Sequence, residues 1–226
     1  MKEKMRVAVV VLAAGSGARF GHSTNKVWLP LKGRTIISRS VKNAVASFND
    51  PRTVLVINPL DRDLAEKVLD AEIPEIDVEI VEGGAARHDS EYNALMYLSE
   101  EIDSGEINVV LIHDGARPLA SEDLFDAVAR TAFEHGGALP GIEVDPREID
   151  VRSDKKIMRV QTPQAFRAKE VLDSYIQAKK DGFIGTDTAA CVEKYYPHIE
   201  SVLVAGEVKN LKITYSPDLA LAEALL

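Results

Sequence analysis

The chain has 226 residues and a mass of 24.7 kDa, which suits one large domain at roughly 100–200 residues per domain. Its 46% hydrophobic and 28% charged residues are close to the average of globular proteins and exclude a fibre or a largely disordered chain. The formal net charge of −9 argues against nucleic-acid and anionic-membrane partners, whose binding surfaces are basic, but a few cations in a cleft suffice for a small anionic substrate.

Strand-like and helix-like runs alternate along the first part of the chain. Residues 7–12 form a continuous apolar, β-branched run, typical of a strand buried on both faces. The runs that follow predict a helix at 35–48, a strand at 53–57, a helix at 61–69, a strand at 78–81, a helix at 89–102, a strand at 109–112 and a helix at 124–133. This alternation predicts βαβ units with right-handed crossovers and a mostly parallel twisted sheet flanked by helices.

The second part of the chain is less regular. Short β-like pieces at 149–152 and 157–160 flank a polar turn, which predicts a small β-arm near residues 142–160. A helix at 169–178 closed by Gly182, strands at 201–204 and 211–213, and a last helix with Ser216 as N-cap and Pro217 at its first position complete the chain. We expect one α/β domain over residues 1–226.

The single cysteine and the apolar runs limit the possible environments. Cys191 excludes a disulfide within the chain and a Cys-rich metal site, and its helix-like apolar neighbours predict a buried structural thiol. No run reaches about 18 apolar residues, and the first residues do not resemble a signal peptide. We therefore expect a cytoplasmic protein with no membrane contact.

A glycine-rich segment follows the first strand directly. Residues 12–21 read LAAGSGARFG, and small residues with exposed N–H groups can cradle a phosphate. The spacing fits neither a dinucleotide-binding motif nor a Walker P-loop. A flexible surface turn is the alternative, but Arg19 and Lys26 beside the glycines favour phosphate binding.

A second glycine pair lies between the third strand and its helix. Gly83 and Gly84 would let a flat base approach the backbone, and Ser90 could bind a ligand or its own helix start. An ordinary turn with an N-cap at Asp89 or Ser90 explains the same residues equally well.

The segment HDGARP at 113–118 follows the fourth strand. Ligands of open parallel sheets bind at the carboxyl ends of the strands, and Mg²⁺ prefers one or two carboxylates together with phosphate oxygens, so Asp114 is a candidate metal ligand. Arg117 either pairs with a phosphate or holds Asp114 in place, and we expect His113 to be packed rather than catalytic.

Three later segments carry weaker signals. Residues 186–188, Thr-Asp-Thr, are typical of a helix N-cap, and residues 161–164 fit a simple turn. Lys212 lies in a strand-like run from which it could reach into the cleft, although edge-strand protection would also explain it.

Together these segments resemble the 2-C-methyl-D-erythritol 4-phosphate cytidylyltransferase family and its close relatives, the ribitol-5-phosphate cytidylyltransferases. The match follows the expected order along nearly the whole chain. It comprises LAAGSGARFG at 12–21, Lys26, GGAARHDS at 83–90, HDGARP at 113–118, QTPQAF at 161–166, TDTAA at 186–190, NLKIT at 210–214 and PDLALAEALL at the end.

The resemblance implies a Rossmann-like nucleotidyltransferase fold and a homodimer whose arm reaches into the partner's site. It implies transfer of CMP from CTP to 2-C-methyl-D-erythritol 4-phosphate, with Mg²⁺ required and diphosphate released, in isoprenoid precursor synthesis. By motif position it assigns Arg19 and Lys26 to transition-state stabilisation and Asp114 to the metal. It assigns the nucleotide to Ala13, Ala14, Gly15, Gly17, Gly83, Gly84 and Ser90, and the acceptor to Arg117, Thr186, Lys212 and, as a candidate arm arginine, Arg159.

The chain departs from the family pattern at three places. Asn25 stands where a proline usually precedes the lysine, which predicts a looser loop; Ala85 stands where an acid is common. The arm lacks the usual Asp-Thr pair, and Arg147, Arg152 and Arg159 are candidates for its arginine. Ribitol 5-phosphate or another polyol phosphate is therefore an alternative acceptor, and a catalytically weak nucleotide-binding paralogue is a third possibility.

Overall fold

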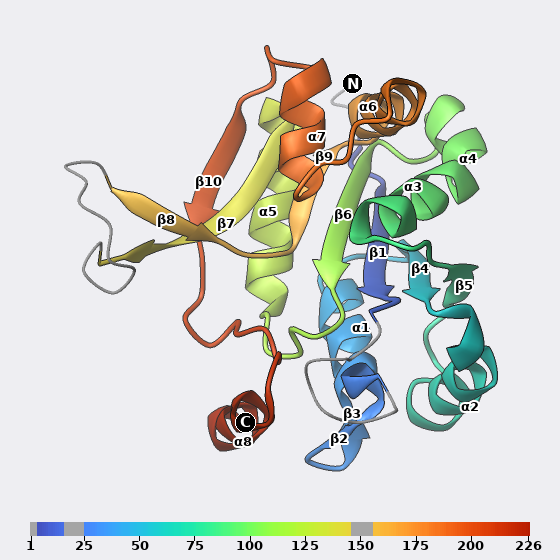
Figure 1. The fold of residues 1–226 in the computed structure, drawn as a ribbon, viewed down its shortest axis with the longest axis vertical. Helices are drawn as coiled ribbons and strands as arrows, with labels where there is room; N and C mark the ends of the chain where they lie inside the picture. The colour runs from blue at the N-terminus through green and yellow to red at the C-terminus, as the bar shows by residue number, and fades with distance from the viewer. Residues whose placement is uncertain (1–3, 16–24, 146–155) are drawn as a thin grey trace.

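A computed structural model describes residues 4–15, 25–145 and 156–226. Its main sheet has the strand order β10-β7-β9-β6-β1-β4-β5, with β8 paired to the outer part of β7 (Figure 1). The strands are β1 (Val7–Ala13), β4 (Arg52–Ile57), β5 (Glu79–Glu82), β6 (Val109–Asp114), β7 (Gly137–Val144), β8 (Ile157–Val160), β9 (Gln164–Arg167) and β10 (Ser201–Ala205). A small separate hairpin joins β2 (Pro30–Leu31) and β3 (Arg34–Thr35).

Helices cover both faces of this sheet. The α-helices are α1 (Ile36–Ala46), α2 (Arg62–Glu72), α3 (Arg87–Tyr97), α4 (Ser99–Asp103), α5 (Glu122–His135), α6 (Ala168–Asp181), α7 (Thr188–Tyr195) and α8 (Ser216–Leu225). Two short 3-10 helices, η2 (Lys26–Trp28) and η3 (Pro59–Asp61), lie in connections. None of the helices in the described part of the chain is both long and apolar enough to span a bilayer.

Strand β1 shows why the sheet needs two layers of helices. Its side chains alternate between faces, so Val9 and Val11 pack in the cluster that includes Phe125 of α5, whereas Val10 packs with Tyr175 of α6. All of these side chains are buried. A strand buried on both faces reads as a continuous apolar run, which is the pattern that predicted it.

The α/β architecture with a mostly parallel sheet is confirmed. β1 pairs in parallel with both β4 and β6, β4 pairs in parallel with β5, and β7 with β10. Strand β9, which the sequence did not predict, runs antiparallel between β6 and β7. Its four residues are too few to show a period.

One local prediction is confirmed in its described part, because the strand predicted at 157–160 is β8, and two others need correction. The hairpin near residues 142–160 is formed by the end of β7 with β8, where Ile142 lies opposite Arg159, and the predicted piece at 149–152 lies outside the described residues. Residues 211–213 form no strand. The last helix has Tyr215 as its N-cap, and Asp218 accepts hydrogen bonds from the backbone N–H groups of Thr214 and Tyr215.

Cys191 and Gly182 behave as predicted. The Cys191 side chain is fully buried in the second core cluster, and burial raises the pKa of its thiol to about 12. Gly182 ends α6 in the left-handed conformation with φ of 65°.

Because the side chains of the inner strands are buried, we expect a cavity made among them to lower the free energy of unfolding strongly. Leu111 of β6 is fully buried, so we expect Leu111→Ala to lower the free energy of unfolding by about 3 kcal/mol. The same substitution at Leu60, which is 92% exposed in η3, should change it by less than about 0.5 kcal/mol. Urea denaturation of both variants measures the difference, and equal losses would contradict the assignment of β6 to the core.

Candidate functional site

A cavity of about 580 Å³ opens at the carboxyl ends of β1 and β6. Its lining comes from six separate stretches of the chain that fold together there. The lining residues are Leu12, Ala13, Ala14, Gly15, Asn25, Lys26, Val27, Asn58, Gly84, Ala85, Ala86, Arg87, Ser90, Asp114, Ala116 and Lys212. Ligands of open parallel sheets bind at this edge, so the cavity is the candidate site.

Strand register brings these stretches together. Leu12 lies opposite Asp114 in the β1–β6 pair, and the N–H of Gly115 donates to the Leu12 carbonyl at 2.9 Å. The N–H of Gly83 donates to the carbonyl of Ile57, the last residue of β4, at 2.8 Å. The turns that follow β1, β5 and β6 are thereby fixed side by side.

Glycine is required at two positions of the turn after β5 for packing within the protein. A Cβ atom on Gly83 would lie 2.3 Å from the Cβ of Ala14, and one on Gly84 would lie 2.2 Å from the Cβ of Asp89. The sequence suggested that these glycines let a ligand approach the backbone. The close contacts are instead made with Ala14 and Asp89 of the same chain, and they shape the wall of the cavity.

Asp114 is the electrostatic centre of the site. Lys212 Nζ donates to its Oδ2 at 2.8 Å, Arg87 Nε lies 3.4 Å from Oδ1, and Arg117 Nε lies 3.6 Å from Oδ2. Burial alone would raise the pKa of Asp114, but these cations outweigh it and hold the pKa well below its usual range. The carboxylate is consequently ionised at neutral pH.

His113 is packed, as predicted. Its ring lies edge-on to Phe125 at 4.8 Å, its Nε2 lies 3.1 Å from the Arg117 carbonyl, and its Nδ1 lies 3.3 Å from the Thr162 hydroxyl. That hydroxyl also accepts the N–H of Asp114 at 3.0 Å. Both ring nitrogens are engaged, so His113 positions Asp114 rather than exchanging protons with a ligand.

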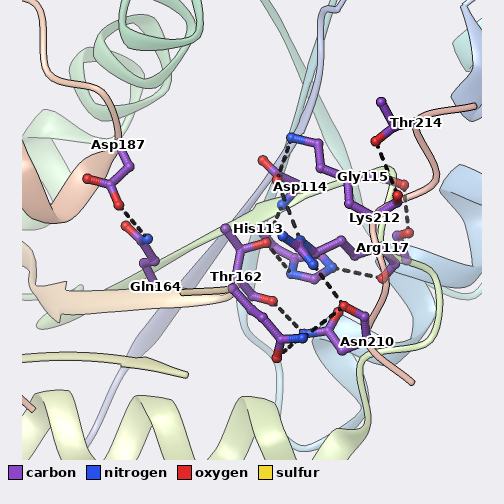
Figure 2. A network of polar contacts seen from close by, with 12 residues as sticks. His113, Asp114, Gly115, Arg117, Thr162, Gln164, Asp187, Asn210, Lys212 and Thr214 are labelled. Atoms are coloured by element: carbon purple, nitrogen blue, oxygen red, sulfur yellow. Dashed lines mark hydrogen bonds and ion pairs between the residues drawn. The ribbon is translucent and has the colours of Figure 1, made fainter. Parts of the chain in front are cut away.

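Buried amides hold the segment that carries Lys212 (Figure 2). Asn210 Nδ2 donates to the Thr162 carbonyl at 2.9 Å, and Gln161 Nε2 donates to the Glu207 carbonyl at 2.8 Å. Arg117 Nη1 donates to the Asn210 carbonyl at 2.8 Å. Lys212 thus enters the cavity from an irregular segment fixed by side chains, which corrects the expectation that it would lie in a strand.

Asn25 anchors the turn before Lys26. Its Nδ2 donates to the Ala13 carbonyl at 2.6 Å, its Oδ1 accepts the N–H of Val27, and the side chain is buried. The expectation of a looser loop is wrong for this residue, because a side chain replaces the rigidity that a proline would give.

Ser90 bonds to its own helix start. Its Oγ accepts the N–H of Gly84 and donates to the carbonyl of Ala86, both at 3.1 Å, while Asp89 accepts the N–H of Ala86. Of the two possibilities left open by the sequence, the structure supports the helix start, and Ser90 reaches the cavity only at its wall.

Some predicted residues do not line this cavity, and others lie outside the described residues. Thr186 is exposed before α7, whose N-cap is Asp187, and Arg159 is exposed on β8. Gln164 donates to Asp187 at 2.9 Å and so ties α7 to the sheet. Gly17, Arg19, Arg147 and Arg152 lie outside the described residues.

Arg87 is a site residue that the motif analysis did not single out. It opens α3, lines the cavity and approaches Asp114, and its guanidinium also pairs with Glu91 at 2.8 Å. Both anions raise its pKa against the effect of burial. The sequence could have identified Arg87, because it lies in the segment GGAARHDS at 83–90 that was selected for its glycines.

Comparison with known proteins identifies relatives along the whole chain. The family model of 2-C-methyl-D-erythritol 4-phosphate cytidylyltransferase (IspD) matches residues 7–226. Proteins of that name from Geobacillus thermodenitrificans and Cereibacter sphaeroides are each 35% identical, covering 98% of this chain and 97% of theirs.

Solved structures that are similar to this chain carry related names. The enzyme of that name from Thermus thermophilus is 28% identical, with a TM-score of 0.69 and 98% of each chain covered. The 4-diphosphocytidyl-2C-methyl-D-erythritol synthase of Anaerococcus prevotii shares the fold at a TM-score of 0.77 and 24% identity, covering 98% of this chain and 96% of its own.

The burial of His113 predicts a pH-dependent stability. Burial lowers the pKa of His113 from its usual 6.5 to about 4. Between these values the unfolded chain binds the proton and the folded chain does not, so stability is lost as the pH falls, by about 3 kcal/mol in total.

We expect the free energy of unfolding of the wild type to fall more steeply from pH 7 to 4.5 than that of His113→Gln. The difference between the two proteins isolates His113, because Glu91 and the other titrating groups are common to both. Denaturant titrations at several pH values measure it, and parallel curves would contradict the prediction.

Proposed function

The chain belongs to the 2-C-methyl-D-erythritol 4-phosphate cytidylyltransferase family, and we propose that its cavity is where CMP is transferred from CTP to 2-C-methyl-D-erythritol 4-phosphate. The reaction releases diphosphate and serves isoprenoid synthesis. The observation that carries the proposal is the lining of the cavity, in which Lys26, Arg87 and Lys212 meet small residues and an ionised Asp114. Because CTP is a cytoplasmic nucleotide, we also propose that the protein works in the cytoplasm.

The chemistry requires charge neutralisation and alignment. A phosphate oxygen of the acceptor attacks the α-phosphorus of CTP, a new P–O bond forms, and the bond to the bridging oxygen of the leaving diphosphate breaks. The second pKa of a phosphate monoester is about 6, so the nucleophile is already ionised at neutral pH and needs no general base. Cations that hold two polyanions in line supply most of the catalysis.

We assign the nucleotide to the turns that follow β1 and β5. Ala13, Ala14 and Gly15 line the cavity, and Gly84 and Ser90 line it from the neighbouring turn. Gly83 supports that wall by packing against Ala14. We assign Lys26, together with Arg19 and Gly17 of the adjoining segment, to the triphosphate.

Mg²⁺ fits the donor set of the cavity. Asp114 is the one acidic side chain in the described lining, and it is held ionised. Mg²⁺ commonly takes one or two carboxylates and fills its remaining positions with phosphate oxygens and water. When bound, the ion would offset triphosphate charge, while Lys212 and Arg117 keep the carboxylate oriented.

The acceptor side requires more than one chain. Lys212 lines the cavity, and Arg117 acts as a positioning residue because it is engaged with Asp114 and the Asn210 carbonyl. Thr186 and Arg159 are not among the lining residues of this chain. We propose a homodimer in which the arm at 142–160 brings Arg159 to the partner's acceptor, with Thr186 at the edge of that site. The described part of the arm is the end of β7 paired with β8, which lies at the side of the sheet in Figure 1.

Turnover with purified protein tests the proposal. Incubation with CTP, Mg²⁺ and 2-C-methyl-D-erythritol 4-phosphate should release diphosphate, and ribitol 5-phosphate should give much less. Arg19→Ala serves as the inactive control. Release no faster than in this control, or a preference for ribitol 5-phosphate, would refute the assignment.

Lys212 should matter through its charge at the cavity. We expect Lys212→Met to lower kcat/KM by at least about 100-fold, the range for a single electrostatic contact in a transition state. Lys209→Met is the matched control, since Lys209 is exposed in the same segment and is not among the cavity residues. Steady-state kinetics of the two variants measure the contrast, and similar losses in both would contradict a specific role for Lys212.

A further inference from the structure

Glu91 is a charged residue in the protein interior whose position the reaction does not by itself explain. It lies on α3 with 1% of its surface exposed, one turn after Arg87. Its Oε2 accepts the hydroxyl of Tyr175 at 2.5 Å, and its Oε1 accepts the hydroxyl of Thr188 at 2.8 Å. Three helices, α3, α6 and α7, therefore meet at this carboxylate.

A buried carboxylate is expensive unless it is paired and hydrogen-bonded. Burial raises the pKa of Glu91, and Arg87 and the two hydroxyls work in the opposite direction. Arg87 Nη1 lies 2.8 Å from Oε1, which makes it the one cation paired with Glu91 in the described structure.

Arg87 is the link between Glu91 and the cavity. Its guanidinium spans the two anions, with Nη1 at Glu91 and Nε 3.4 Å from Asp114 Oδ1. Among the described contacts, Arg87 meets both Glu91 and Asp114 as ion pairs without a hydrogen bond, whereas Lys212 does donate to Asp114. The Arg87 side chain keeps 29% of its surface exposed at the cavity wall.

We propose that Glu91 is a positioning residue that holds the Arg87 guanidinium at the cavity wall and prevents it from closing onto Asp114. An arginine with a single nearby carboxylate tends to form a bidentate pair with it. A second anion at Nη1 divides the guanidinium between two partners. This leaves Asp114 Oδ1 accessible and directs positive charge at the bound triphosphate. This inference rests on the function proposed above.

The arrangement also explains why Thr188 and Tyr175 carry hydroxyls where they do. Both residues are buried and their hydroxyls donate to Glu91, Thr188 to the Oε1 that also pairs with Arg87 and Tyr175 to Oε2, so both carboxylate oxygens are held in place. Thr188 is the first residue of α7 and directly follows the N-cap Asp187. The Thr-Asp-Thr segment is thus connected to the cavity through Glu91 and Arg87.

Substitution of Glu91 by its uncharged isostere tests the proposal. We expect Glu91→Gln to lower kcat/KM for CTP by about 10-fold or more and to weaken CTP binding measured by calorimetry, with the melting temperature nearly unchanged. Glu79→Gln is the matched control, because Glu79 is paired with Arg52 on β4 and neither residue lines the cavity. It should leave both quantities within about twofold.

A double-mutant cycle separates positioning from a general loss of stability. If Glu91 acts through Arg87, then Glu91→Gln in an Arg87→Gln background should cause little further loss, because contacting residues that act together are not additive. If Glu91→Gln does not fold, Glu91→Leu takes its place, and we expect the same loss of kcat/KM and of CTP affinity from it. Additive losses, or wild-type binding and turnover in Glu91→Gln, would overturn the proposal.

The two proposals fail in different ways. Absence of turnover in the wild type would refute the proposed reaction, while CTP calorimetry on the Glu91 and Arg87 variants would still report on the pair. Normal wild-type turnover with an unaffected Glu91→Gln would refute the positioning role alone.

Discussion

The parallel pairing of β1 with β6 is the constraint on which the site depends. It sets Leu12 opposite Asp114, so that the turn after one strand lies beside the acid that ends the other. Each strand is buried on both faces, and a shift of one residue would exchange its two sets of apolar side chains between the helical layers. The hydrophobic core thereby fixes the register, and the register places the charges.

The charge balance of the whole chain differs from that of its cavity. The net charge of −9 is spread over the surface, whereas three cations and one carboxylate line the described part of the cavity. Local field, and not total charge, determines what a cleft binds. An acidic protein can therefore bind a triphosphate and a phosphosugar.

The sequence was most informative where a pattern was long or where residues followed a strand directly. β1 was predictable from its continuous apolar run and the helices around it from their period. Asp114 stood out because it follows a strand, and Lys26 because it lies beside the glycine segment. β9 has too few residues to show a period, and the Lys212 segment is held by Gln161 and Asn210, whose side-chain bonds have no periodic signal. The contact between Arg87 and Asp114 joins residues far apart in the chain, so only the assembled sheet reveals it.

The order of the chain has a consequence for how the site is made. Lys212 pairs with Asp114 across 98 residues, and it lies after the last strand of the sheet, β10. During synthesis from the N-terminus, the strands that form the cavity emerge first, and the lysine that completes its charge pattern emerges after all of them. A nascent or incompletely folded chain thus holds the cavity walls without their full set of cations. The full set of cavity cations is therefore present only once the C-terminal part of the chain has been made and has joined the sheet.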